Sequence, residues 1–158
     1  YRMSQELGVS RNEATLLIEN YFNKYPGIQS YIDLTLSQAR NYKFVETLLG
    51  RKRPILDANS DNGIIRKAAE RMAINMPIQG SAAEMIKLAM INIQKKINEA
   101  RLRSKLVLQI HDELLFEFPI EEKKELIKLV VGEMENAVKL SVPLKVDYGV
   151  GQSWFEAH

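Results

Sequence analysis

Two adjacent carboxylates, Asp112 and Glu113, stand between two segments rich in β-branched and aromatic residues, 105–111 and 114–118. If the two segments pair as a β-hairpin, the two acids form its turn. Tight hairpin turns favour Asn-Gly or Asp-Gly because their central residues tend to need a positive φ, and Glu is a poor choice there. Adjacent negative charges also repel each other unless a cation lies between them. A local conflict of this kind indicates a site, and carboxylate oxygens are ligands that Mg²⁺ prefers.

The register of the predicted hairpin determines how firmly the two acids are held. With Asp112 and Glu113 in the turn, Ile110 lies opposite Leu115, and both faces of the ribbon are largely apolar. We therefore predict that the ribbon is packed on both sides and holds its tip rigidly. The alternative is an ordinary solvated turn, in which His111 is a surface histidine or one whose polar atoms are satisfied in the core.

A second group of polar side chains, Arg71, Asn75 and Gln79, recurs every four residues upstream of the hairpin. On a continuous helix these positions share one face. Arginine can bind a phosphate, whereas Asn and Gln can donate to the adenine N3 and thymine O2 acceptors of the minor groove. The pattern therefore indicates a nucleic-acid face, and the alternative is a solvated helix face. Pro77 lies inside the run and is predicted to end one helix or begin the next.

The composition limits the class of protein that carries these residues. A chain of 158 residues can form one ordinary globular core, and 46% hydrophobic and 27% charged residues are typical of globular domains. The absence of cysteine excludes a disulfide scaffold, a thiol nucleophile and a Cys-ligated zinc site. No apolar run approaches the ~20 residues that cross a bilayer, so we expect no membrane partner. The net charge of +2 does not by itself indicate nucleic acid.

Helices and short strands follow one another without the regular strand–helix repeat of a parallel sheet. Ser10 and Glu13 form a capping box before an amphipathic helix, which Pro26 breaks. The remaining predicted helices span about 29–40, 64–75, 78–97 and 121–138, and the predicted strands about 44–47, 53–55, 105–111, 114–118 and 144–148. We therefore predict an α+β fold in which a small antiparallel sheet, including the metal-site hairpin, is packed by long helices.

Four motifs follow in order along the chain. The first two are the run from Arg71 through Asn75 and Gln79 to Ala83 and, about thirty residues on, Gln109-Ile110-His111-Asp112-Glu113-Leu114. The other two are Val142-Pro143-Leu144-Lys145-Val146 and the ending Gly149-x-Gly151-x-x-Trp154-x-x-Ala157-His158. Together they resemble the C-terminal part of family A DNA polymerases, the bacterial DNA polymerase I type. The resemblance covers essentially the whole chain.

The resemblance implies part of a right-hand polymerase fold. Residues 1–75 would form the C-terminal part of the fingers, and residues 76–158 a portion of the palm with the third polymerase motif. The implied partners are primer–template DNA, dNTP and the remainder of the polymerase chain. The implied location is the bacterial cytoplasm, in association with the nucleoid.

The resemblance also implies roles for the site residues. Asp112, with Glu113 beside it, would help to hold two Mg²⁺ ions about 3.5–4 Å apart, which bridge the primer 3′-hydroxyl and the triphosphate during nucleotidyl transfer. The residues with implied DNA contacts are His111 at the primer terminus and Arg71, Asn75 and Gln79 along the primer–template, with Gln79 at the minor groove.

Several features of the family are missing from this sequence. The first polymerase motif, with its Asp on the central palm strand, is absent, and so is the fingers helix whose Lys and Tyr hold the incoming nucleotide. Arg2 stands where the family commonly has glycine, and an altered order at residues 53–57 leaves the DNA contact of that region open. We therefore expect a fragment that cannot synthesise DNA alone and that exposes an apolar palm edge. The competing classes are a non-catalytic nucleic-acid-binding module and a plain helical interaction domain.

Overall fold

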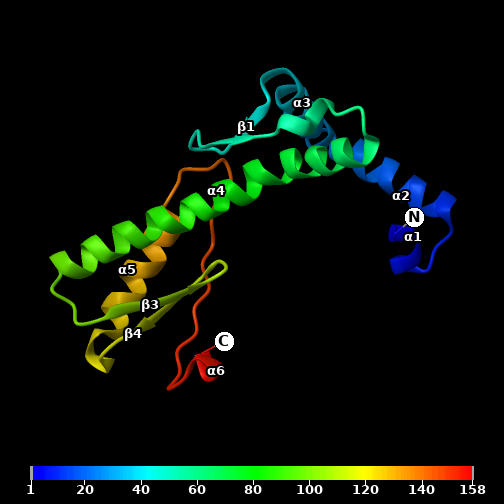
Figure 1. The fold of residues 1–158 in the computed structure, drawn as a ribbon. Coiled ribbons are helices and arrows are strands. Elements are labelled where there is room, and N and C mark those ends of the chain that lie inside the picture. Colours follow the sequence, from blue (N-terminus) through cyan, green and yellow to red (C-terminus); the bar gives the residue numbers. More distant parts are fainter. Residues whose placement is uncertain (1, 158) are drawn as a thin grey trace. The chain divides into compact units, whose positions relative to one another are not determined.

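The chain folds as two compact units, and one long helix runs through the boundary between them. The computed structural model describes residues 2–157, with side chains from Ser4 on. The first unit ends at Ile78 and the second begins at Gln79, within helix α4 (Gly63–Glu99). Figure 1 shows the order of the elements along the chain. Among the described residues, no helix is both long and apolar enough to span a membrane.

The first unit is mostly helical. Its elements are α1 (Arg2–Leu7), α2 (Arg11–Lys24), α3 (Pro26–Tyr42), β1 (Phe44–Glu46), β2 (Lys52–Pro54), the 3₁₀ helix η1 (Leu56–Asn59) and the first part of α4. The predicted capping box of α2 is present: Ser10 Oγ accepts from the Glu13 N–H at 3.2 Å, and the Glu13 carboxylate accepts from the Ser10 N–H at 2.9 Å. Pro26 follows α2 and begins α3, where its missing N–H needs no partner.

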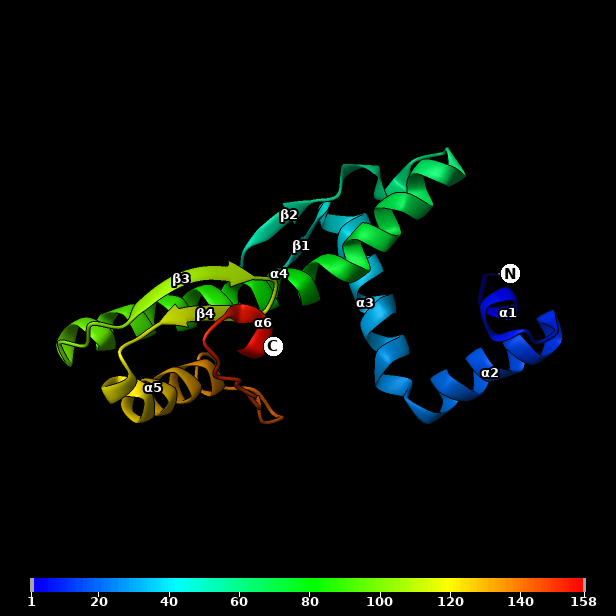
Figure 2. The same cartoon turned by 90° about the horizontal axis from the view of Figure 1, so that it is seen from below.

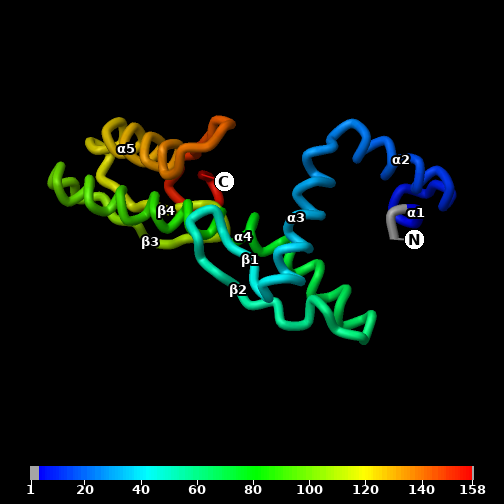
Figure 3. Tube along the Cα trace, turned by 90° about the horizontal axis from the view of Figure 1, so that it is seen from above, coloured from blue at the N-terminus to red at the C-terminus, as the bar shows by residue number. Residues whose placement is uncertain are grey.

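A short hairpin follows α3. Lys43 ends α3 with φ 62°, and β1 then pairs antiparallel with β2, as predicted, with Val45 opposite Arg53. The connecting turn needs a positive φ of 84° at Gly50, which glycine adopts without strain. Figure 3 traces β1 as it runs beside α3. The buried residues that form the core of this unit are Ala39, Val45, Ile55, Ala58, Ala69 and Ala73.

The second unit packs a hairpin and a helix onto the C-terminal half of α4 (Figure 2). Its elements are the rest of α4, β3 (Lys105–Ile110), β4 (Glu113–Glu117), the 3₁₀ helix η2 (Ile120–Glu122), α5 (Lys123–Glu135) and α6 (Trp154–Ala157). Ile93 and Ile97 of α4 are buried with Leu126 of α5. The helix predicted at about 121–138 is confirmed as α5, and Val130 and Met134 of α5 pack against this cluster together with Ala137.

Helix α4 continues through Pro77, so the prediction of two separate helices is wrong. A proline removes one N–H donor and crowds the carbonyl four residues back, which costs about 3 kcal/mol. Packing on both sides of the proline maintains the helix. Ala73 is buried in the core of the first unit, and Ile93 is buried in the core of the second. The burial of these two apolar stretches outweighs the loss of one hydrogen bond.

The predicted strand at residues 144–148 does not form. The described residues contain two separate two-stranded sheets, β1–β2 and β3–β4, instead of one palm sheet. Apolar alternation suits an extended segment, but a strand also needs a neighbour for its backbone groups. The Val146 N–H donates instead to the Glu135 carboxylate at 3.3 Å. The α+β class is confirmed in its coarse form, as helices with small antiparallel sheets.

The segment before α6 folds back closely on that helix. A Cβ added at Gly149 would lie 1.7 Å from the Ala157 carbonyl oxygen, and one at Gly151 would lie 2.5 Å from the Glu156 Cβ. The Glu156 carboxylate also accepts from the Gln152 N–H at 2.7 Å. The two glycines are therefore required by close approach.

Candidate catalytic site

His111, Asp112 and Glu113 lie at the tip of the β3–β4 hairpin. Ile110 pairs with Glu113, so the two loop residues are His111 and Asp112, and Glu113 is the first residue of β4. The predicted turn of Asp112 and Glu113 is therefore wrong by one position. His111 has φ 53°, a left-handed conformation that His adopts more readily than most non-glycine residues. Gln109 Nε2 donates to the His111 carbonyl at 3.0 Å, which supports the turn.

Only one face of the hairpin is packed in the described chain. The pairing shifts between Leu106 and Leu108, and beyond this bulge the strands keep a regular register to the turn. Leu114 and Phe116 pack against the core of the second unit. Leu108, which pairs with Leu115, is 49% exposed. The prediction of packing on both faces is therefore wrong, and the hairpin tip is supported from one side.

Asp112 and Glu113 are both exposed at the end of this hairpin. Their carboxylate oxygens are hard donors, so the chemistry of the pair fits Mg²⁺. Mg²⁺ demands octahedral coordination, and two adjacent side chains supply only part of it. Within residues 2–157, no group of three or more His, Asp and Glu side chains gathers as a possible metal site. The pair therefore fits a partial metal site.

The three predicted DNA-facing residues of the upstream segment are exposed residues of α4. Because α4 is continuous, Arg71, Asn75 and Gln79 follow one another at intervals of four residues on one helix. At 3.6 residues per turn, Arg71 and Asn75 of the first unit differ by about 40° around the axis and share one face, whereas Gln79 belongs to the second unit. The contacts of these residues with DNA stay a prediction.

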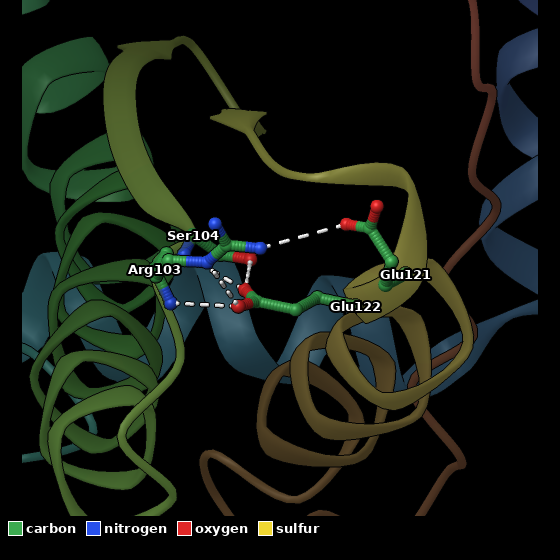
Figure 4. Close-up of polar contacts among 4 residues, drawn as sticks. All are labelled: Arg103, Ser104, Glu121 and Glu122. Atoms are coloured by element: carbon green, nitrogen blue, oxygen red, sulfur yellow. Dashed lines mark hydrogen bonds and ion pairs between the residues drawn. The ribbon is translucent and has the colours of Figure 1, made fainter.

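A carboxylate at the other end of the hairpin organises the loop before β3, and no spacing in the sequence indicated it. Glu122 accepts from the N–H groups of Arg103 and Ser104 at 2.9 and 3.0 Å and from the Ser104 hydroxyl at 2.6 Å (Figure 4). The Ser104 hydroxyl, followed by the Arg103 N–H, holds the pKa of Glu122 below its ordinary value. Ser104 and Glu122 lie 18 positions apart in the sequence, so local pattern rules could not detect the contact.

Comparison with known proteins connects these features to a family. A model of DNA polymerase family A matches residues 1–156. The chain belongs to the family A DNA polymerases. The resemblance drawn from the motifs around Gln79 and Asp112 is therefore confirmed.

Curated bacterial relatives match nearly all of this family A chain. The DNA polymerase I of Lactococcus lactis subsp. cremoris is 46% identical over 157 residues, that of Bacillus caldotenax 48% over 157, and that of Caldicellulosiruptor bescii 49% over 156. Each match covers 99% of this chain and 18% of the relative. The family A chain thus spans less than a fifth of the length of these proteins.

A solved structure shares the fold of this family A chain. The POL domain of Pol1 from M. smegmatis, in a complex with DNA primer-template and dNTP, matches with a TM-score of 0.96 and 46% sequence identity. The match covers 99% of this chain and 28% of that one. The combination of helices with small antiparallel sheets is therefore the fold of a polymerase domain.

Proposed function

We propose that the protein to which this chain belongs carries out template-directed DNA synthesis, in which a nucleotide is transferred from dNTP to a primer 3′-hydroxyl. The observation that carries the proposal is the position of Asp112 and Glu113 together at a hairpin tip, in a chain that matches the family A model over residues 1–156. The relatives named DNA polymerase I support this reaction. The primer-template and dNTP in the M. smegmatis complex support these substrates.

Asp112 and Glu113 are the proposed metal ligands of this chain. Mg²⁺ held by them would activate the primer 3′-hydroxyl and stabilise the pyrophosphate leaving group. The residues of this chain position the two carboxylates. The backbone of His111 places Asp112 at the tip, and the pairing of Glu113 with Ile110 holds the second carboxylate in a strand. The remaining ligands belong to other parts of the parent protein.

Four further residues are proposed to bind the primer–template. Arg71 would bind a backbone phosphate, and Asn75 and Gln79 would donate to minor-groove acceptors, with Gln79 near the reacting end. His111 would contact the primer terminus from the turn. Their exposure on α4 and at the hairpin tip supports these roles, because each side chain can reach a ligand.

The two compact units support an assignment to polymerase subdomains. We assign residues 1–75 to the C-terminal part of the fingers and residues 76–158 to the palm. The boundary between Ile78 and Gln79 lies close to that division. The remainder of the polymerase chain is then the third partner, beside DNA and dNTP. Because the relatives are bacterial, we expect the parent protein to act at the nucleoid in the cytoplasm.

The substitution Asp112→Asn in the intact parent protein tests the metal role. We expect primer extension with Mg²⁺ to slow by at least about 10³-fold, because a metal site supplies several kcal/mol of charge stabilisation. The Kd for primer–template should change little. Asp61→Asn is the matched control, because Asp61 is an exposed aspartate of the first unit. Near-normal turnover of the Asp112 variant would remove the proposed metal ligand.

A non-catalytic nucleic-acid-binding module is the alternative function. It shares the exposed residues Arg71, Asn75 and Gln79 but not the chemistry of Asp112. Salt-dependent DNA binding by the unmodified parent protein, without any Mg²⁺-dependent extension of a primer, would favour it.

A further inference from the structure

A pocket on α5 brings three lysines and a tyrosine together. Its volume is about 400 Å³, and its lining residues are Lys123, Lys124, Ile127 and Lys128 of α5 with Tyr148 and Val150 of the segment before α6. All of them belong to the second unit. Pockets of roughly 300–1,000 Å³ bind small ligands, so this one can hold a group the size of a single nucleotide.

The two acids that precede these lysines in the sequence, Glu121 and Glu122, are bound elsewhere. The Glu121 carboxylate lies 3.5 Å from the Arg103 guanidinium, and Glu122 accepts hydrogen bonds from Arg103 and Ser104. Figure 4 shows both carboxylates in contact with the Arg103–Ser104 loop. None of the three pocket lysines forms an ion pair within the described part of the chain. Their positive charge is therefore available to a ligand.

Two features of the lysine positions are unfavourable for the helix, and Glu125 is the acid that shares its first turn with Lys123 and Lys124. Lys123 and Lys124 lie in the first turn of α5, where the helix dipole disfavours positive charge. Lys124 and Lys128 are four residues apart on one face, so their charges repel each other. An anion bound in the pocket would relieve both effects. Local preferences broken in this way indicate a functional site.

We propose that this pocket binds single-stranded nucleic acid, with the lysines on backbone phosphates and one base against the Tyr148 ring. The ring is 66% exposed, and Ile127 and Val150 provide apolar surface beside it. Lysine contacts to phosphates together with stacking on an aromatic ring bind single strands without sequence preference. An acidic peptide would use the lysines but would not need the exposed ring.

The pocket is separate from the proposed catalytic turn. Strand β4 has five residues, which corresponds to about 17 Å at ~3.4 Å per residue, and η2 and α5 follow its far end. A nucleotide in the pocket is therefore not the one that reacts at Asp112. The site provides a second contact with a strand, beyond the catalytic function proposed above.

A binding experiment on the intact parent protein tests the site. The primer–template site is first saturated with an unlabelled duplex. A fluorescein-labelled oligothymidylate of about 12 nucleotides, a length within the range bound by known single-strand sites, is then titrated at several salt concentrations. In the variant Lys123→Gln/Lys124→Gln/Lys128→Gln, the slope of log K against log salt should fall by about 2, since each phosphate contact contributes about 0.7 on a single strand. Primer extension should be unchanged.

Further variants distinguish the possible ligands. Tyr148→Leu should weaken oligonucleotide binding at least about fivefold, and Tyr148→Phe should restore it, because the phenyl ring still stacks. The matched control Lys95→Gln/Lys105→Gln/Lys139→Gln removes the same charge from exposed lysines outside the pocket and should leave binding unchanged.

Three outcomes would overturn the proposal. The first is that no oligonucleotide binds once the primer–template site is filled, and the second is an equal effect of the control triple variant. The third is that polyglutamate or tripolyphosphate competes as well as the oligonucleotide while Tyr148→Leu has no effect. That result would identify a surface for acidic protein or free phosphate.

Discussion

Glu122 accepts three hydrogen bonds from the loop before β3, two from the backbone N–H groups of Arg103 and Ser104 and one from the Ser104 hydroxyl. Bonds to the ionised form hold the pKa of Glu122 below its ordinary value of 4.5. A carboxylate of this kind stabilises the fold above its unfolded pKa. This contribution is lost as the pH falls through the folded pKa.

In the 158-residue chain, the variant Glu122→Gln should therefore be less stable than the unmodified chain at pH 7. It should also lose less stability on acidification from about pH 5 to about pH 3. The measurement is the urea midpoint as a function of pH, followed by fluorescence of Trp154, the single tryptophan, which lies in the second unit. Glu125→Gln is the control, because Glu125 is an exposed residue of the same helix. The same pH dependence in both variants would contradict a role of Glu122 in stability.

The hairpin turn shows how far prediction at single residues can go. The conflict between two adjacent acids and a tight turn was visible in the sequence, and the structure does place Asp112 and Glu113 together at the hairpin tip. The register was not predictable from the apolar pattern. The register depends on the positive φ of His111 and on the pairing shift near Val107. An alternating apolar pattern is compatible with either position of the turn, so it does not decide between them.

Among the elements, α4 offers a matched test of what holds the second unit together. Ile93 is fully buried against α5 and β4, whereas Ile91 of the same helix is 65% exposed. Ile93→Ala should lower the free energy of unfolding by about 2–5 kcal/mol, because it loses buried area and leaves a cavity. Ile91→Ala should change it by no more than about 0.5 kcal/mol. Urea unfolding followed at Trp154 measures both, and equal effects would show that this core is misplaced.

Elements determined by residues close in the sequence were predictable, and elements determined by contacts between distant segments were not. The capping box of Ser10 and the helix predicted at about 121–138 depend on residues three or four apart, and both are confirmed. The continuity of α4 through Pro77 depends instead on two cores built from distant segments. The failure of residues 144–148 to form a strand depends on the lack of a pairing neighbour in the described chain. Neither condition can be recognised from a short stretch of a single sequence.

For the molecule as a whole, we expect that the 158-residue chain alone will not extend a primer. The reason is that Asp112 and Glu113 fit only a partial metal site, and the described residues contain no larger cluster of potential ligands. Primer extension with Mg²⁺ and dNTP, with the intact parent protein as the positive control, measures this. Clear incorporation of nucleotides by the chain alone would contradict it.

The close approach of the tail has a consequence for how the chain tolerates mutation. Gly149 and Gly151 are two of the five residues that define the ending of the chain, which helped to reveal the family, yet neither carries a side-chain group that can bind or react. They are conspicuous because Ala157 and Glu156 occupy the space of a side chain. In a saturation-mutagenesis library selected for polymerase activity, we expect even alanine, the smallest replacement, to be depleted at Gly149. A motif that identifies a polymerase can thus report the shape of the tail and not its chemistry.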